Sequence, residues 1–408
     1  MASAFAALAV EIIELIAEAS DPADLISLRL VCKGLYRKTL HCFGQKFFTT
    51  VRTDLSCSSL QKLQNIAEEE PLRHHVQTLL IKRSPTQSGR WFHDPEQDLR
   101  WRRHPSGYLE IQDSEFRLLR RVLVEGLVNC RSFNVHGHDD VDGLYESNRL
   151  TPSDAVGIIL AIVADTSLPV KSFSVDFSPN STGRLDAKRL QLPLYQQPEF
   201  RSGWSHIQEL LLEYSIDSND LDWALDLVLH APKLERLSLN FYDHSSQFIN
   251  RLTKEGQLPA LQSLRLTSAY VTVESISKLL MSCRDSLREL SLKFVRLEHG
   301  GAWATVLREL RSNFSLLESF SLLWLRGEDK SGGILHLMFP TLSDNPIVSG
   351  SEDASLPRSD CRLLKPLGLP INLVYKRFRK EVRVIGVNYH GRRMDAVLDI
   401  LAESAEVL

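Results

Sequence analysis

The residues best suited to binding a metal ion lie in the sequence HGHDD, which contributes His136, His138, Asp139 and Asp140. Alternating imidazoles followed by carboxylates could coordinate zinc or a dinuclear centre. A fuller His-x-His-x-Asp-His pattern would need histidine at position 141, where this chain has Val141. The segment also follows a weak strand pattern, at a point where a polar loop is expected. We therefore favour a solvated loop over a metal site, and we expect no cofactor.

A second group of residues could contact a partner. The sequence GRWFHDPEQDLRWRRHP interleaves aromatic and basic side chains, namely Arg90, Trp91, Phe92, Arg100, Trp101, Arg102 and Arg103. Such side chains can stack on nucleic-acid bases or anchor a protein. The acidic residues Asp94, Glu96 and Asp98 dilute the positive charge, which weakens the nucleic-acid interpretation. Two interpretations stay open: a loop fixed to its domain by tryptophans, and a protein contact, because Trp and Arg dominate interface hot spots.

A third group is the basic sequence YKRFRKEVR, which runs from Tyr375 to Arg383. It could meet an acidic partner or lie in a nuclear-localisation patch. A solvated edge before the last strand is the more common role of such a charge run. We favour that role.

Nothing in the chain has the spacing of a nucleophilic or nucleotide-binding site. The sequence contains no G-x-S-x-G elbow and no G-x-x-x-x-G-K-[ST] loop. The six cysteines form no C-x-x-C pair, so a zinc ribbon or a redox pair is not expected. We predict that the chain is not an enzyme.

Composition narrows the class of protein. The 408 residues are 43% hydrophobic and 24% charged, which is typical of two or three globular domains. The net charge of -3 argues against nucleic acid as a partner. The longest apolar runs, Met1–Val10 and Ala155–Ala164, are half of the roughly 20 residues that a membrane helix needs. The start also lacks the pattern of a signal peptide. We expect a soluble protein of the cytoplasm, the nucleus or both.

The elements that must position any site begin with residues 8–43, which read as three short helices. Helical spacing places one apolar stripe on the first helix, formed by Leu8, Ile12, Leu15, Ile16 and Ala19. Asp21 can cap the second helix, and Pro22 suits its first position. Three such helices bury too little apolar area to be strongly stable alone, so a partner or a neighbouring domain is expected.

The sequence LAVEIIELIAEASDPADLISLRLVCKGLYRK resembles the F-box. The matches occur in order and without a gap at Leu8, Glu11, Ile12, Ile16, Pro22, Asp24, Leu25, Val31, Cys32, Lys33, Leu35 and Tyr36. Ala9 stands where the family has Pro, and Leu35 stands where Trp is frequent. The resemblance covers about a tenth of the chain and implies a small helical domain over residues 1–50.

The rest of the chain carries a recurring L-x-x-L-x-L pattern. Clear copies begin at Ile207, Leu234, Leu261, Leu287 and Leu317, with spacings of 27, 27, 26 and 30 residues. Weaker copies begin at Val76, Cys130 and Val170, and their wider spacings indicate inserted loops. Apolar stripes between the copies predict helices, for example Leu221, Leu225 and Val228. The chain resembles a leucine-rich-repeat horseshoe, an α/β solenoid in which each unit is a strand followed by a helix.

The resemblances divide the chain into four parts. After residues 1–50, the repeats occupy 51–325 and include a loop near 84–107. Residues 326–375 have the proline-, glycine- and serine-rich composition of a loop or of a partly disordered segment. Residues 376–408 then predict a strand and a helix that cap the solenoid.

Together the resemblances imply the substrate-recognition subunit of an SCF-type (Skp–cullin–F-box) ubiquitin ligase. The family pattern places contacts with a Skp-type adaptor, and through it a cullin, at Leu8, Ala9, Ile12, Leu25, Leu28, Val31, Cys32 and Leu35. These apolar residues would otherwise be exposed on a small helical unit. The alternative is a repeat-protein scaffold in which a degenerate F-box only caps the solenoid.

The repeats imply a binding face for a protein. The leucines of L-x-x-L-x-L turn inward, and the residues between them point to the opposite, concave face of the sheet. There they form three rows, which begin at Glu209, Leu211 and Glu213. The rows are mostly small and polar and carry isolated charges, so we expect a protein ligand. The candidate contacts are Glu209, Glu213, Arg236, Asn240, Arg265, Glu289 and Lys293.

Overall fold

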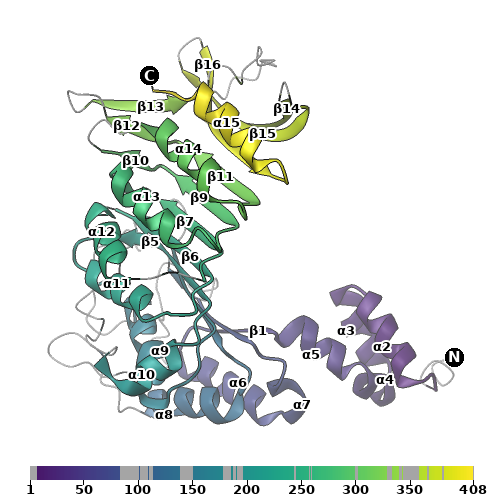
Figure 1. The fold of residues 1–408 in the computed structure, drawn as a ribbon. Helices are drawn as coiled ribbons and strands as arrows, with labels where there is room; N and C mark the ends of the chain where they lie inside the picture. The colour runs from purple at the N-terminus through teal and green to yellow at the C-terminus, as the bar shows by residue number, and fades with distance from the viewer. Residues whose placement is uncertain are drawn as a thin grey trace. The chain divides into compact units, whose positions relative to one another are not determined.

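The computed structural model is a mixed α/β protein (Figure 1), which confirms the predicted class. It describes residues 7–82, 101, 109, 114–137, 150–177, 185–186, 190, 196–242, 245–256, 258, 260–298, 302–328, 333–339, 342, 358–364, 367–378 and 381–407. The chain divides into two compact units, Met1–Ser181 with Asp186–Trp204 and Thr182–Leu185 with Ser205–Leu408. The division between the units, near residues 181–186 and 204–205, falls inside residues 51–325, which the sequence predicted as one run of repeats.

Between residues 7 and 48 the structure describes four helices, because the third predicted helix is divided at Thr39. They are α2 (Val10–Ala19), α3 (Pro22–Val31), α4 (Lys33–Lys38) and α5 (Leu40–Phe48). Asp21 caps α3 as predicted: its Oδ1 accepts a hydrogen bond of 2.8 Å from the Asp24 backbone N–H, and Pro22 opens the helix. The Lys46 ammonium ends α2 by donating to the carbonyls of Ala17, Glu18 and Ser20.

The remainder of the first unit alternates strands and helices. Its strands are β1 (Thr50–Thr53), β2 (Thr78–Ile81), β3 (Ser132–Gly137) and β4 (Ser172–Phe177). They pair in parallel in that order. The helices are α6 (Cys57–Glu68), α7 (Glu70–Arg73), α8 (Ser114–Arg121), α9 (Pro152–Thr166) and α10 (Pro198–Trp204), with a π-helical turn at Val122–Gly126. The three weak copies of the leucine pattern are therefore strands, and β1 is a strand that the pattern missed.

Gly44 lets α5 approach α7 closely. A Cβ atom at Gly44 would overlap the imidazole of His75, which also lies 5.0 Å from the His41 ring between centroids. Burial, and then the neighbouring His41 and His74, lower the pKa of His75. The lowered pKa favours the neutral imidazole, and the contact joins α5 to the segment that follows α7.

The second unit continues the alternation of strands and helices. The parallel strands are β5 (Glu209–Ile216), β6 (Arg236–Phe241), β7 (Ser263–Thr267), β9 (Glu289–Lys293) and β11 (Ser319–Leu323). The helices are α11 (Leu221–Leu229), α12 (Ser245–Glu255), α13 (Val273–Ser282) and α14 (Trp303–Asn313). Leu237, Leu264 and Leu290 occupy equivalent inward positions and are buried. The clear copies of the pattern are therefore in-register strands over one apolar core.

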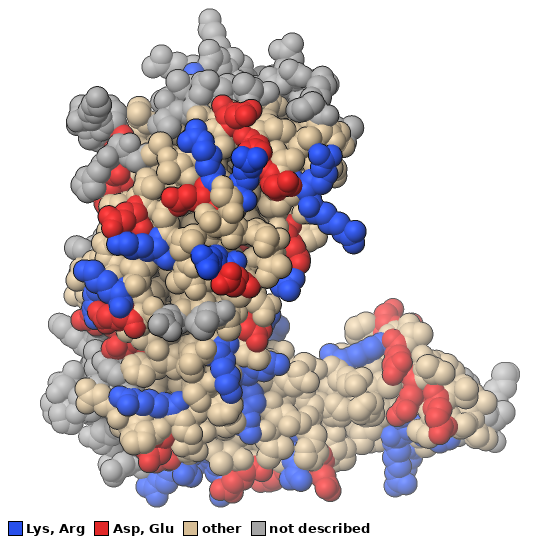
Figure 2. Space-filling model, in the orientation of Figure 1, with Lys and Arg blue, Asp and Glu red and all other residues tan. Residues whose placement is uncertain are grey.

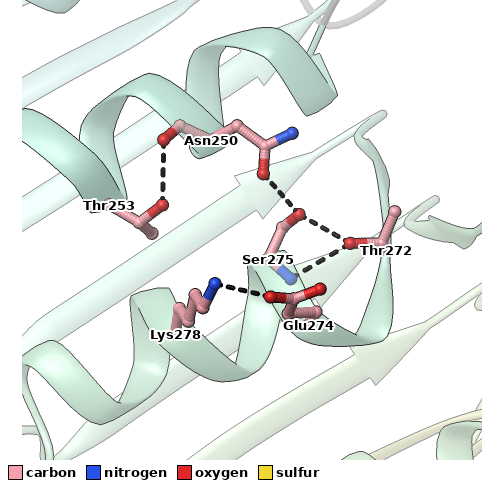
Figure 3. Close-up of polar contacts among 6 residues, drawn as sticks. All are labelled: Asn250, Thr253, Thr272, Glu274, Ser275 and Lys278. Carbon is pink, nitrogen blue, oxygen red and sulfur yellow. Dashed lines mark hydrogen bonds and ion pairs between the residues drawn. The ribbon is translucent and has the colours of Figure 1, made fainter.

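Polar contacts join each helix of this unit to the next. Figure 3 shows that Ser275 of α13 donates a hydrogen bond of 2.7 Å to Asn250 of α12, while Thr272 caps α13 by accepting from the Ser275 backbone N–H. Comparable contacts join α11 to α12 through Asp222 and Arg251 and α13 to α14 through Ser277 and Glu309. The side-chain contacts keep consecutive helices aligned above the strands.

The prediction of a loop over residues 326–375 is wrong for the described part of that segment. It contains β12 (Arg326–Glu328), β13 (Ile334–Met338), β14 (Arg358–Leu364) and most of β15 (Leu369–Phe378). β14 and β15 pair antiparallel, and β15 continues into β16 (Glu381–His390), which pairs antiparallel with β11. The proline-rich composition hid these strands because prolines are tolerated at strand starts and edges.

The predicted C-terminal strand and helix are confirmed as β16 and α15 (Met394–Ser404). Arg311 of α14 and Asp399 of α15 form an ion pair of 2.8 Å. A second, smaller sheet joins β17 (Glu406–Val407), β13, β12, β10 (Arg296–Leu297) and β8 (Tyr270–Val271). Among the described residues, no helix combines the length and the apolar character that crossing a bilayer requires.

Candidate functional site

The N-terminal helices fill their own core. Ile13 and Ala17 of α2, Leu25 of α3, Leu35 of α4 and Cys42 of α5 are buried. Ala17, Leu25 and Cys42 form one cluster, against which the partly buried Phe43 and Phe47 pack. The helices therefore have an inner apolar surface that is already covered.

Arg29 links three of these helices. Its guanidinium carbon lies 4.1 Å from the ring centroid of Tyr36 and 3.9 Å from that of Phe43. Its Nη1 donates to the carbonyl oxygen of Tyr36 at 3.1 Å and to the Thr39 hydroxyl at 3.4 Å. Only 6% of Arg29 is exposed, so its charge is held by aromatic faces and hydrogen bonds rather than by water.

The same helices carry a second apolar surface, which faces solvent. Eight of the thirteen exposed large hydrophobic side chains among the described residues lie between Leu8 and Tyr36. We call this group the outer apolar set: Leu8, Val10, Ile12, Leu15, Ile26, Leu30, Val31 and Tyr36. Their exposure runs from 37% at Leu8 to 80% at Leu30. Such a concentration of exposed apolar side chains makes this surface a candidate interaction site.

The predicted adaptor contacts divide between the two surfaces. Leu8, Ala9, Ile12 and Val31 are exposed, and Leu28 and Cys32 are half-buried. The expectation of exposure is wrong for Leu25 and Leu35, which are 0% and 1% exposed. Leu25 shares the buried face of α3 with Arg29, one helical turn away. Leu35 is the buried residue of α4.

Four members of the outer apolar set have no counterpart in the predicted contacts or stripe: Val10, Ile26, Leu30 and Tyr36. Ile26 and Leu30 are four residues apart and therefore share the outer face of α3. This spacing was available in the sequence. What the sequence lacked was a way to decide that Leu25 and Arg29, rather than Ile26 and Leu30, face inward.

The candidate binding face of the second unit is the sheet surface opposite the leucine core, which we call the outer polar face. The first predicted row is confirmed, since Glu209, Arg236, Ser263, Glu289 and Ser319 are successive partners in the ladder. The second row, which runs from Leu211 through Ser238, Arg265 and Ser291 to Ser321, is confirmed by the same ladders.

The third row differs from the prediction at its start. Asn240, Thr267, Lys293 and Leu323 are in register, but the β5–β6 ladder is irregular after Leu212, so Glu213 is not the partner of Asn240. The Glu213 carboxylate instead accepts hydrogen bonds from the Ser238 hydroxyl at 3.0 Å and from Arg265 Nη1 at 3.1 Å. The irregular register thus joins the second and third rows.

Charges on the first part of this face are paired across strands. Arg236 Nε lies 2.8 Å from Glu209 Oε1, and this hydrogen bond raises the pKa of Arg236. Arg265 pairs with Glu213 in the same way. On the side of the molecule shown in Figure 2, basic and acidic side chains also interleave over the described surface. The distribution offers no basic track for a nucleic acid on that side.

The predicted metal-binding sequence is only partly described. His136 lies on β3, and its Nδ1 is 3.7 Å from Asp176 Oδ2 on β4, whereas His138, Asp139 and Asp140 lie outside the described residues. Within the described part of the chain, no three His, Cys, Asp or Glu residues group in a way that could hold a metal ion. Of the predicted loop 84–107, only Trp101 is described; it is buried and donates to the Leu55 carbonyl at 3.3 Å.

No protein-family model matches the chain, and no curated protein matches it.

Proposed function

We propose that the chain is a non-catalytic substrate-recognition subunit of an SCF-type ubiquitin ligase. In this proposal the N-terminal helices dock on a Skp-type adaptor, and the adaptor links them to a cullin. The strand–helix units form a leucine-rich-repeat solenoid that holds the target protein. The chain would raise the effective concentration of a target lysine near the ubiquitin-loaded enzyme.

The observation that carries the proposal is the outer apolar set. Its side chains are exposed although the helices have a complete inner core of their own. Burying one exposed leucine or isoleucine at an interface contributes roughly 1.5–3 kcal/mol. Several members of the set, covered together, would supply the hydrophobic centre of a stable protein–protein interface.

The strands support the second half of the proposal. Five parallel strands present rows of small polar and paired charged residues, among them Ser263, Ser291 and Ser321. Such a surface suits a protein ligand with its own polar groups, because it satisfies hydrogen bonds at many points.

The test is co-purification of the full chain with a Skp-type adaptor. Ile12→Asp and Leu30→Asp place a carboxylate in the outer apolar set, at positions where the free protein keeps it in water. Burying that unpaired charge on binding costs several kcal/mol, so adaptor affinity should fall by about 100-fold or more. Ile334→Asp is the matched control, since Ile334 is 50% exposed but lies on β13 of the second unit.

Unchanged adaptor binding by both variants, or no binding by the unsubstituted chain, would contradict the proposal. In the second case the alternative is a repeat-protein scaffold with a degenerate F-box. Affinity purification from cells with and without proteasome inhibition separates the two. A ligase substrate accumulates with the chain when the proteasome is blocked, whereas a scaffold partner does not change.

A further inference from the structure

Three successive strands of the second unit end in the same unusual backbone conformation. Ser268, Phe294 and Trp324 have φ angles of 56°, 56° and 54°. They follow Thr267, Lys293 and Leu323, which are in-register partners, so the three residues are equivalent. The left-handed region is uncommon for residues other than glycine and asparagine and is unfavourable for a bulky side chain.

The left-handed turn itself has a structural purpose that needs no aromatic ring. After each turn the chain enters a strand of the smaller sheet, β8, β10 or β12. The turn residues also donate backbone hydrogen bonds to the next strand of the larger sheet, at 2.8–2.9 Å. Glycine or asparagine would serve this backbone at lower cost. The choice of Phe294 and Trp324 therefore points to a use of their side chains.

The two rings form a partly exposed platform. Their centroids are 6.3 Å apart and their planes differ by 13°. Trp324 is anchored, because with Leu323 it packs against the buried Met338, Val374 and Ile385. Gly386 permits this packing, since a Cβ atom there would lie 2.6 Å from Leu323 Cδ1. Phe294 is 42% exposed and leaves part of the platform open to solvent.

Lys376 and His336 lie beside the Trp324 ring of the platform. Lys376 Nζ lies 4.4 Å from the centroid of the Trp324 ring, and His336 meets the same ring edge-on at 5.8 Å. Burial, and then the positive charges of Arg326 and Lys376, lower the pKa of His336. Glu328 faces the same region, but it pairs with Arg296 at 2.6 Å. Arg326 and Lys376 therefore contribute positive charge on this side of the platform.

This region differs from the rest of the outer polar face. Arg236 and Arg265 are paired with Glu209 and Glu213 from nearby strands. Lys293 instead stands between Thr267 and Leu323 in its row, and neither neighbour carries a charge. We call the group Lys293, Phe294, Trp324, His336 and Lys376 the aromatic–basic corner.

We propose that the aromatic–basic corner binds an acidic peptide segment, in which an aromatic or aliphatic side chain lies beside carboxylates. The apolar side chain would cover Phe294, and the carboxylates would contact Lys293 and Lys376. Aromatic anchors and complementary charge are the features that give protein interfaces their affinity and specificity. The inference rests on the proposed function, because it takes the acidic segment to be part of the target protein that the repeats hold.

The test uses the full chain and a fluorescent peptide that contains two Glu-Glu-Phe-Glu-Glu blocks, with binding followed by anisotropy. One control peptide has lysine in place of glutamate, and another has alanine in place of phenylalanine. The Glu–Phe peptide should bind more tightly than either control by about tenfold or more. Its affinity should also fall as salt is raised.

Phe294→Ser introduces the residue that already occupies the equivalent position 268, so the turn is preserved. It should weaken binding of the Glu–Phe peptide by about tenfold. The double variant Lys293→Glu with Lys376→Glu should weaken it further. Lys254→Glu is the matched control, because Lys254 is exposed on α12, away from the corner, and its reversal should leave binding unchanged.

Equal binding of the acidic and basic peptides, or full affinity in both corner variants, would overturn the inference. So would inorganic tripolyphosphate binding that matches the peptide in affinity and ignores Phe294→Ser, since the corner would then be a simple anion site. Adaptor co-purification is measured separately on the same variants. Retained adaptor binding with no peptide binding rejects only the corner, whereas the reverse result rejects only the ligase role.

Discussion

On helix α3, Leu25 is 0% exposed, whereas Leu30, five residues further along, is 80% exposed. At 3.6 residues per turn the two side chains point about 140° apart around the helix axis. One side chain is therefore part of the helical core, and the other belongs to the outer apolar set. This separation means that folding and binding can be perturbed independently on a single helix.

Leu25→Asp and Leu30→Asp should accordingly differ strongly in their effect on stability. A carboxylate at position 25 would be buried without a partner and should cost the N-terminal helices about 3 kcal/mol or more, enough to unfold them. At position 30 the same change stays in water and should alter stability by no more than about 0.5 kcal/mol. Hydrogen exchange of the α2–α5 amides measures both; equal protection in the two variants would contradict the assigned faces.

The leucine pattern allowed much of the second unit to be predicted, and the reason is physical. A buried parallel strand needs large apolar side chains at every second position, and the same spacing recurs at Leu237, Leu264 and Leu290. The register of the first two rows followed from that recurrence. The third row failed at Glu213, because an irregular register after Leu212 leaves no trace in the residue types.

The buried face of the N-terminal helices was harder to predict, because α2 and α3 are apolar on two faces. Ile12 and Ile13 are adjacent and equally hydrophobic, yet Ile13 is buried and Ile12 is 46% exposed. Periodicity identifies a stripe but cannot choose between two stripes. Strand β1 was missed for another reason: the buried Thr53, a polar residue, occupies the inward position that Ile81 holds on β2. Of the aromatic–basic corner, the sequence indicated only the basic run that contains Lys376, since the corner joins residues of four different strand regions.

The three core leucines of the second unit should contribute similar amounts to its free energy of unfolding. Leu237→Ala, Leu264→Ala and Leu290→Ala each remove a side chain that is at most 2% exposed. Each should lower the free energy of unfolding by about 2–5 kcal/mol through lost burial and cavity formation. Leu211→Ala is the matched control, because Leu211 is half-buried on the outer polar face. Urea unfolding measures the difference, and tolerance of all three core changes would contradict the register.

A buried carboxyl predicts a pH dependence of stability. Burial raises the pKa of Asp220 from 3.8 to about 6, although the nearby Tyr214 hydroxyl and the hydrogen bond from the Asp217 backbone N–H oppose the shift. Because the folded pKa is the higher one, the folded state binds the proton more tightly. The stabilisation is complete below the unfolded pKa and is lost as pH rises through about 6.

Asp220→Asn removes this titration while keeping an acceptor for the Asp217 backbone N–H. From about pH 4.5 to about pH 7.5, the stability of the variant relative to the unsubstituted chain should rise by about 2 kcal/mol. Urea unfolding at the two pH values provides the measurement. Asp285→Asn serves as the control, since that side chain is 87% exposed. A constant difference between variant and parent across this range would contradict the buried, proton-binding carboxyl.

The Glu213 carboxylate, where the β5–β6 ladder is irregular, accepts hydrogen bonds from both Ser238 and Arg265. The Arg265–Glu213 ion pair is half-exposed, with side-chain exposures of 51% and 34%, so its coupling in a double-mutant cycle should be about 0.2–1 kcal/mol. Glu213→Ala should cost about 1 kcal/mol more than Arg265→Ala, because it also leaves the buried Ser238 hydroxyl without this acceptor. Glu213→Gln keeps an oxygen for Ser238 and should recover that additional loss. If Glu213→Gln is as destabilising as Glu213→Ala in urea unfolding, the Ser238 hydrogen bond does not contribute and the charge alone matters.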